Sequence, residues 1–227
     1  MRGGRAKLPV LAEVSAFAPG AEQVWSLRRA DFERLTEVAD GLGDKRTVLV
    51  TGGTELGGPL AIALAGAAGA AGRRTVLVEC DIARPRLAVD LGLEPTPGLH
   101  EYLRWEATPE QVLQPMALAG PAAGAASEPL VFVAAGRQVP DPATLFGLQS
   151  FRHMCTKLGA AYDLVVLAGP RLDEGGPGLA AIAAAANGLL VAISPQQTSR
   201  RAARELREAI VDLPVSTLGA VVVGSGE

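Results

Sequence analysis

Six short apolar runs recur along the chain and predict the strands of a sheet. The runs lack the polar alternation of a half-exposed strand, as is typical of strands buried on both faces of a parallel sheet. They cover Arg46–Thr51, Thr75–Cys80, Leu130–Ala134, Tyr162–Leu167, Gly188–Ile193 and Leu218–Val223.

Segments with helical spacing or helix-start signals fall between these runs. They cover Glu22–Ala39, Pro59–Ala71, Leu99–Arg104, Pro109–Leu113, Pro142–Leu158, Gly178–Asn187 and Ser199–Leu213. Strand–helix alternation predicts an α/β fold, a doubly wound and mainly parallel sheet with helices on both faces and right-handed crossovers.

The rest of the pattern predicts a single domain. Residues 1–20 show no period and are expected to form a flexible N-terminal arm, and the Ala/Gly/Pro-rich stretch 117–127 is expected to be a loop. Residues 21–227 contain no linker that would divide two cores, so they are expected to form one domain.

Composition narrows the class of protein. The 227 residues are 48% hydrophobic and 20% charged, which is enough for a buried core, and the net charge of −3 argues against a nucleic-acid binder. No signal peptide or bilayer-spanning segment is evident, so a cytoplasmic protein without direct membrane insertion is expected. Cys80 and Cys155 lie in apolar runs and are expected to be buried free thiols.

The first predicted strand runs into a glycine-rich turn, Gly52-Gly53-Thr54-Glu55-Leu56-Gly57-Gly58-Pro59-Leu60. Such a turn before a helix suits phosphate binding, because backbone N–H groups and the helix N-terminus face the anion. The phosphate-loop pattern requires Lys and then Ser or Thr after its second glycine, whereas this chain has Pro59 and Leu60 there. The alternative is a tight turn that needs positive φ at Gly57 and Gly58.

Several segments, in order, resemble the bacterial tyrosine kinases of capsule and exopolysaccharide synthesis, a branch of the MinD/ParA-like deviant phosphate-loop ATPases. The similar segments span about residues 20–224 and comprise Val76-Leu77-Val78-Glu79-Cys80-Asp81-Ile82-Ala83-Arg84-Pro85, Pro97-Gly98-Leu99, Pro140-Asp141-Pro142-Ala143-Thr144-Leu145, Tyr162-Asp163-Leu164-Val165-Val166 and Leu218-Gly219-Ala220-Val221-Val222. The resemblance implies a P-loop NTPase-like fold of the MinD/ParA type.

The departures from the family fall on its functional positions. Pro59 and Leu60 replace the Walker A Lys and Ser/Thr, Ala168 stands at the Walker B Asp, and Glu79 replaces the first Asp of the strand-two motif. Asp81 is retained. The N-terminal oligomerisation pattern reads Glu22, Trp25, Arg28 without its middle Arg, and the C-terminal tyrosine cluster is absent from this sequence.

The resemblance and these departures together predict a catalytically dead pseudo-kinase or pseudo-ATPase. We expect a cytoplasmic assembly or regulatory partner in exopolysaccharide biosynthesis and export, recruited to the inner face of the membrane by the cytoplasmic part of an export or chain-length protein. The resemblance also allows a homo-oligomer or pairing with related ATPases. The alternatives are a divergent active ATPase or tyrosine kinase of this family and a MinD/ParA-like positioning factor.

No catalytic or metal-binding residue is assigned. Gly53, Gly57, Gly58 and Asp81 are the expected vestigial nucleotide-binding positions, and Glu22, Trp25 and Arg28 the expected interface. No cofactor is expected, with weak binding of ATP or ADP and magnesium as the alternative. Asp81 is either a remnant of a metal or base position, or a cap and partner of Arg84.

A further alternative concerns the basic side chains of the last predicted helix. Arg200, Arg201, Arg204 and Arg207 are interleaved with Glu205 and Glu208, so they form either a solvated face or a docking surface.

Overall fold

The computed structural model describes residues 8–15, 28–116, 130–174, 176–195 and 199–224. They form one eight-stranded sheet with the order β1-β8-β7-β2-β6-β3-β5-β4. Seven strands are parallel, and only β4 runs antiparallel to its neighbour. The strands are β1 (Val10–Val14), β2 (Thr47–Gly52), β3 (Thr75–Glu79), β4 (Gln114–Met116), β5 (Leu130–Val133), β6 (Leu164–Ala168), β7 (Gly188–Ile193) and β8 (Thr217–Val223).

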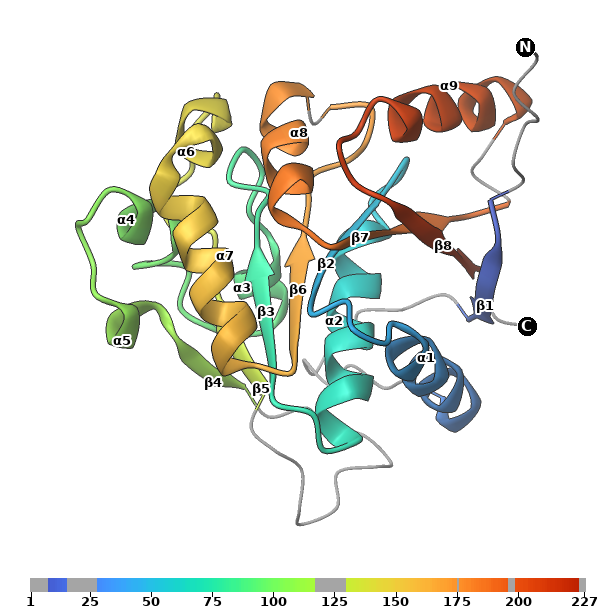
Figure 1. Ribbon diagram of the computed structural model, residues 1–227, viewed down its shortest axis with the longest axis horizontal. Helices are drawn as coiled ribbons and strands as arrows, with labels where there is room; N and C mark the ends of the chain where they lie inside the picture. The colour runs from blue at the N-terminus through green and yellow to red at the C-terminus, as the bar shows by residue number, and fades with distance from the viewer. Residues whose placement is uncertain (1–7, 16–27, 117–129, 175, 196–198, 225–227) are drawn as a thin grey trace.

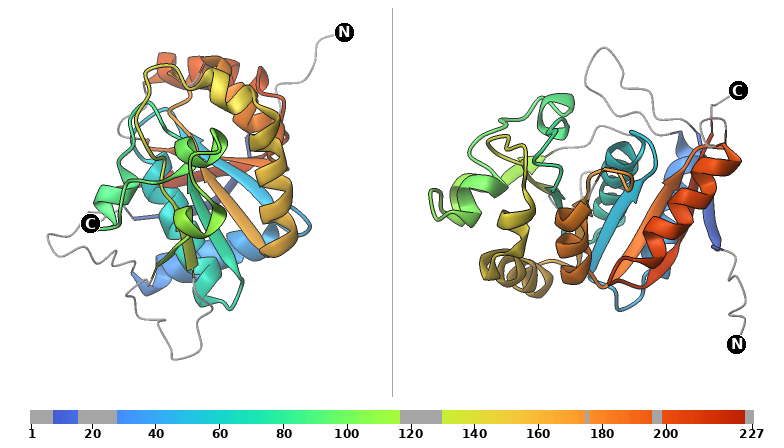
Figure 2. Two further views of the ribbon diagram at one scale, coloured as in Figure 1. Left: turned by 90° about the vertical axis from the view of Figure 1, so that its left-hand side faces the viewer. Right: turned by 90° about the horizontal axis from the view of Figure 1, so that it is seen from above.

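Helices cover both faces of this sheet (Figures 1 and 2). They are α1 (Arg29–Gly41), α2 (Gly57–Ala70), α3 (Leu87–Asp90), α4 (Leu99–Leu103), α5 (Pro109–Val112), α6 (Ala143–Gly147), α7 (Gln149–Ala161), α8 (Gly176–Ala185) and α9 (Arg200–Val211). The predicted doubly wound, mainly parallel α/β fold is confirmed.

Side-chain alternation in the central strands builds two separate cores. In β2, Val48 and Val50 face the core shared with α1 and α2, whereas Leu49 faces the core shared with α4 and α6 to α9. All three side chains are fully buried. Because both faces are covered, continuous apolar runs are the pattern that this sheet requires.

The N-terminal segment differs from the expected arm. Residues Val10–Val14 form β1 and pair in parallel with β8 at the edge of the sheet. The prediction of a flexible arm over residues 1–20 is therefore wrong at this strand. The segment includes Glu13 and has exposed positions along its length, so it lacks the continuous apolar run by which the central strands are predicted.

Two other predictions need correction. The helix expected over Pro142–Leu158 is two helices, α6 and α7, because Leu148 adopts extended backbone angles between them. The short elements α3 and β4 were not expected. The loop expected over 117–127 lies outside the described residues, as does the start of the helix expected from Glu22.

Among the described residues, no helix is long and apolar enough to cross a membrane.

Candidate functional site

The glycine-rich turn joins β2 to α2 at the carboxyl edge of the sheet. A Cβ atom on Gly52 would lie 2.7 Å from the Ala192 carbonyl oxygen of β7, and one on Gly57 would lie 3.1 Å from the Thr51 Cα. Neither Gly57 nor Gly58 has a positive φ, so the alternative of a turn that needs positive φ there is wrong. Glycine is required instead because two backbone segments approach closely.

The positions that would supply phosphate-binding chemistry hold apolar groups. Leu60 is 1% exposed and packs in the core between α2 and the sheet, and Ala168, at the end of β6, is 2% exposed. Pro59 lines a hollow beside the turn and brings neither a charge nor a backbone N–H. These three residues therefore offer no cation, hydroxyl or carboxylate to a nucleotide.

The hollow beside the turn, which we call the carboxyl-edge hollow, has a volume of about 240 Å³. It brings together three of the four predicted nucleotide positions, Gly57, Gly58 and Asp81, whereas Gly53 lines a separate small cavity under α9. The charged residues that line the carboxyl-edge hollow are the arginines Arg84, Arg86 and Arg171 and the acids Glu55, Glu79, Asp81 and Asp90. Carboxylates thus outnumber cations around it.

Carboxylates hold two of the three arginines. Arg171 forms ion pairs with Glu55 at 3.3 Å, with Asp173 at 2.6 Å and with Glu174 at 3.7 Å. Hydrogen bonding to Arg171 lowers the pKa of Asp173 below its usual value, so this carboxyl is charged at neutral pH. Arg84 pairs with Asp81 and Glu174. Within the described residues no ion pair is found for Arg86, which is exposed.

Glu79 is a structural anchor rather than a ligand. Its side chain is buried, and one carboxylate oxygen accepts hydrogen bonds from the Arg86 and Leu87 N–H groups, both at 2.6 Å. The other oxygen accepts from the Ala135 N–H at 3.2 Å. Burial raises the pKa of Glu79, and these N–H donors offset part of that rise. The carboxylate therefore joins β3 to the start of α3 and to the end of β5.

Asp81 acts as a cap and as a partner of Arg84, which is one of the two roles that the sequence allows. Its Oδ1 accepts a hydrogen bond from the Arg84 N–H at 3.2 Å, and its Oδ2 lies 4.0 Å from the Arg84 guanidinium. Burial raises the pKa of Asp81, and Arg84 partly offsets this effect. No cluster of three or more His, Cys, Asp or Glu suited to a metal ion occurs among the described residues.

The expected interface residues are only partly visible. Glu22 and Trp25 lie outside the described residues. Arg28 precedes α1 and pairs through its Nε with the buried Asp31 at 3.3 Å, which anchors the start of the helix. On α9, Arg201 pairs with Glu205 and Arg204 with Glu208 one turn further on, which supports the solvated-face interpretation.

The sequence interpretation missed Arg171 as a residue of this site. The available signal was its place directly after Gly169-Pro170, at the carboxyl end of a predicted strand, where loops of a parallel sheet gather around ligands. Its partner Asp173 lies two residues further along the same loop, whereas Glu55 comes from the glycine-rich turn, which only the fold brings close to it.

Comparison with known proteins places this arrangement in context. No protein-family model matches the chain. A tyrosine-protein kinase of Bacillus subtilis, YwqD, is 26% identical over 159 residues, which are 67% of this chain and 60% of that protein. The chain thus matches less than two thirds of the length of this curated relative.

Solved structures share the fold. The kinase domain of the Escherichia coli tyrosine kinase ETK aligns with a TM-score of 0.79 at 15% identity, covering 96% of this chain and 91% of that one. MinD from Pyrococcus horikoshii, solved with Mg-ADP, aligns with a TM-score of 0.59 at 16% identity, covering 78% and 69%. The chain is thus similar in sequence to a bacterial tyrosine-protein kinase, and it shares its fold with a tyrosine kinase domain and with MinD.

Proposed function

We propose that this protein is a pseudo-kinase that neither hydrolyses ATP nor phosphorylates tyrosine, and that it acts as an assembly or regulatory partner in exopolysaccharide biosynthesis and export. The observation that carries the proposal is the charge pattern at the glycine-rich turn. Apolar residues stand at Pro59, Leu60 and Ala168, and two of the three arginines that line the hollow, Arg84 and Arg171, are held by carboxylates.

Phosphoryl transfer in this fold depends on positioning and on charge stabilisation. A charge-assisted contact contributes roughly 1.5–3 kcal/mol, so the loss of the Lys–phosphate contact alone weakens binding by about tenfold or more. Glu55 and Asp81 also line the hollow and would repel a triphosphate. The residues present do not fit nucleotide–magnesium.

The partner that this proposal implies is the cytoplasmic part of a membrane protein for polysaccharide export or chain-length control. Support comes from the relationship to the tyrosine kinases. In this role the fold serves as a scaffold, recruited to the inner face of the membrane by that partner, and it also allows a homo-oligomer or pairing with a related ATPase. Protein–protein recognition needs no intact Walker residues.

Calorimetric titration of the full chain with ADP and ATP, with and without magnesium, tests the proposal. We expect no binding heat at ligand concentrations up to about 1 mM, the weak end of the usual affinity scale. A micromolar Kd would overturn the proposal. ATP hydrolysis that disappears in Asp81→Ala but persists in a matched surface variant, Asp212→Ala, would overturn it as well.

One observation favours a divergent active ATPase as a second candidate. Arg86 lines the carboxyl-edge hollow and has no ion-pair partner among the described residues, so it is the side chain most able to replace the lost Lys. This candidate predicts nucleotide binding that is lost in Arg86→Ala and retained in Arg207→Ala, which removes an exposed arginine of α9.

A further inference from the structure

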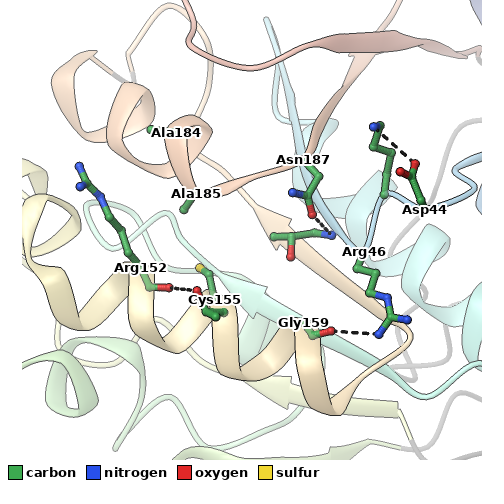
Figure 3. A pocket seen from close by; sticks show the side chains of 11 residues that line it. Asp44, Arg46, Arg152, Cys155, Gly159, Ala184, Ala185 and Asn187 are labelled. Carbon is green, nitrogen blue, oxygen red and sulfur yellow. Dashed lines mark hydrogen bonds and ion pairs between the residues drawn. The ribbon is translucent and has the colours of Figure 1, made fainter.

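A second hollow lies at the opposite, amino edge of the sheet. It is bordered by the segment that leads into β2, by Asn187 just before β7, by one side of α7 and by the end of α8 (Figure 3). Its volume is about 410 Å³, which is within the range of small-molecule sites. The residues that line it are Asp44, Lys45, Arg46, Thr47, Arg152, Cys155, Thr156, Gly159, Ala184, Ala185 and Asn187.

Cations are in surplus around this amino-edge hollow. Lys45, Arg46 and Arg152 line it, against the single carboxylate of Asp44. Asp44 is 90% exposed at its side chain and pairs with Lys45 at 3.4 Å. Within the described residues no carboxylate pairs with Arg46 or Arg152, so two positive charges stay uncompensated.

Arg46 has one structural task that must be separated from ligand binding. Its Nη1 donates a hydrogen bond to the Gly159 carbonyl oxygen at 3.3 Å, near the end of α7. A cation at that end of a helix stabilises the exposed carbonyls. Arg152 has no such contact for its guanidinium in the described part of the chain, so capping does not explain it.

Neutral donors complete the wall. Asn187 accepts a hydrogen bond from the Thr47 N–H through its Oδ1 (Figure 3). Its side-chain amide nitrogen bonds no other described residue and can donate into the hollow. The Thr47 side chain is buried, and its hydroxyl has no hydrogen bond to another described residue. Burial raises the pKa of the Cys155 thiol to about 12, so this wall carries no thiolate that would repel an anion.

The two arginines lie at opposite ends of the hollow, with Asn187 between them (Figure 3). The two guanidinium groups come from different elements on either side of Asn187, so each can meet a different anionic group. An elongated molecule with an anionic group at each end meets both, and its polar middle meets the amide and hydroxyl donors. Guanidinium groups are well suited to phosphate because they present a fork of N–H donors.

We propose that the amino-edge hollow is a binding site for a small phosphorylated metabolite that carries two separated anionic groups. The site is separate from the carboxyl-edge hollow, and the proposal holds whether or not the protein binds ATP. Its ligand would act on this protein as an effector, since the Cys155 thiol in the wall is kept protonated by burial and no metal-binding cluster occurs among the described residues.

Titration of the full chain with fructose 1,6-bisphosphate, glucose 6-phosphate and glucose tests the charge requirement. We expect a Kd at or below about 1 mM for the bisphosphate, which is the weak end of ordinary specific binding. The monophosphate should bind about tenfold more weakly, and glucose should not bind. Added salt should weaken the bisphosphate interaction.

Two variants locate the site. Arg152→Ala removes a guanidinium without a partner and should weaken bisphosphate binding about tenfold. Asn187→Asp keeps the acceptor for the Thr47 N–H but replaces the amide donor by a negative charge, so it should abolish binding while the thermal midpoint changes little. Arg207→Ala, on the exposed face of α9, is the matched control and should bind as the wild type does.

Equal affinity in the wild type, Arg152→Ala and Asn187→Asp would overturn the proposal, as would an absence of bisphosphate binding at about 10 mM. A hexaglutamate peptide that binds more tightly than the bisphosphate would also overturn it, because the hollow would then serve an acidic protein segment.

Discussion

Arginine side chains line a hollow at each edge of the sheet, but the charges around the two hollows differ. At the carboxyl edge, three arginines line a hollow with four carboxylates, and ion pairs occupy Arg84 and Arg171. At the amino edge, three cations meet one exposed carboxylate. Arginine alone therefore does not make an anion site. The balance of neighbouring charges decides whether a guanidinium is available to a ligand.

The edges also differ in what their charges do for the fold. Glu79 at the carboxyl edge is buried and joins three segments through backbone N–H groups. The side chains of Arg46 and Arg152 at the amino edge are exposed. Loss of the Glu79 side chain should destabilise the protein, whereas loss of the Arg152 side chain should leave its stability almost unchanged.

The largest effect is expected for Glu79→Ala. The substitution leaves the N–H groups of Arg86, Leu87 and Ala135 without their acceptor in a buried place, so the free energy of unfolding should fall by about 3 kcal/mol or more. Urea unfolding measures this change. Glu94→Ala, at an exposed position, serves as the control, and an equal loss in both variants would contradict the anchor role.

The next effect concerns the glycine-rich turn. Pro59→Lys should tighten ADP binding about tenfold relative to Pro59→Ala, because one charge-assisted contact contributes roughly 1.5–3 kcal/mol. The Ala variant restores the backbone N–H without the charge, so the pair isolates the cation. Calorimetry measures both affinities. If the two variants bind ADP equally, the turn has lost its phosphate-binding geometry as well as its lysine.

A smaller effect is expected from pH, which should change the stabilising contributions of Glu79 and Glu101 in opposite directions. Burial raises the pKa of Glu79, whereas that of Glu101 is lowered, because N–H donors from Gly98 and Arg137 outweigh its burial. The stabilising effect of Glu79 is thus fully present below about pH 4.5 and declines as the pH rises through its raised pKa. That of Glu101 is present above about pH 4.5 and is lost as the pH falls through its lowered pKa.

The free energy of unfolding of Glu79→Gln and Glu101→Gln, measured from acid to neutral pH, tests this difference. Each variant should be destabilised by about 1–3 kcal/mol at its worst pH, which reflects one mispaired donor. Relative to the wild type, Glu79→Gln should lose least at neutral pH and Glu101→Gln should lose least in acid. Parallel pH profiles for the two variants would contradict the assigned pKa directions.

Local sequence determined much of this architecture. The apolar run Gly188–Ile193 predicts the first and last residues of β7 correctly, because a strand buried on both faces must be apolar throughout. The cap at Ser199 accepts a hydrogen bond from the Ala202 N–H at 3.1 Å, and it marks the start of α9 as the sequence indicates. The strand β1 was not predicted, because its partners, β8 at the sheet edge and the core that Ala12 and Val14 enter, are distant in the sequence.

What the sequence by itself determined is the fold class and the missing chemistry at Pro59, Leu60 and Ala168, since a residue type needs no partner to lack a charge or a hydroxyl. Only the tertiary structure decided that carboxylates hold Arg171 and that no acid pairs with Arg152 among the described residues. Coulombic interaction depends on distance in space, and residues far apart in the chain, such as Glu55 and Arg171, become neighbours only when the sheet assembles.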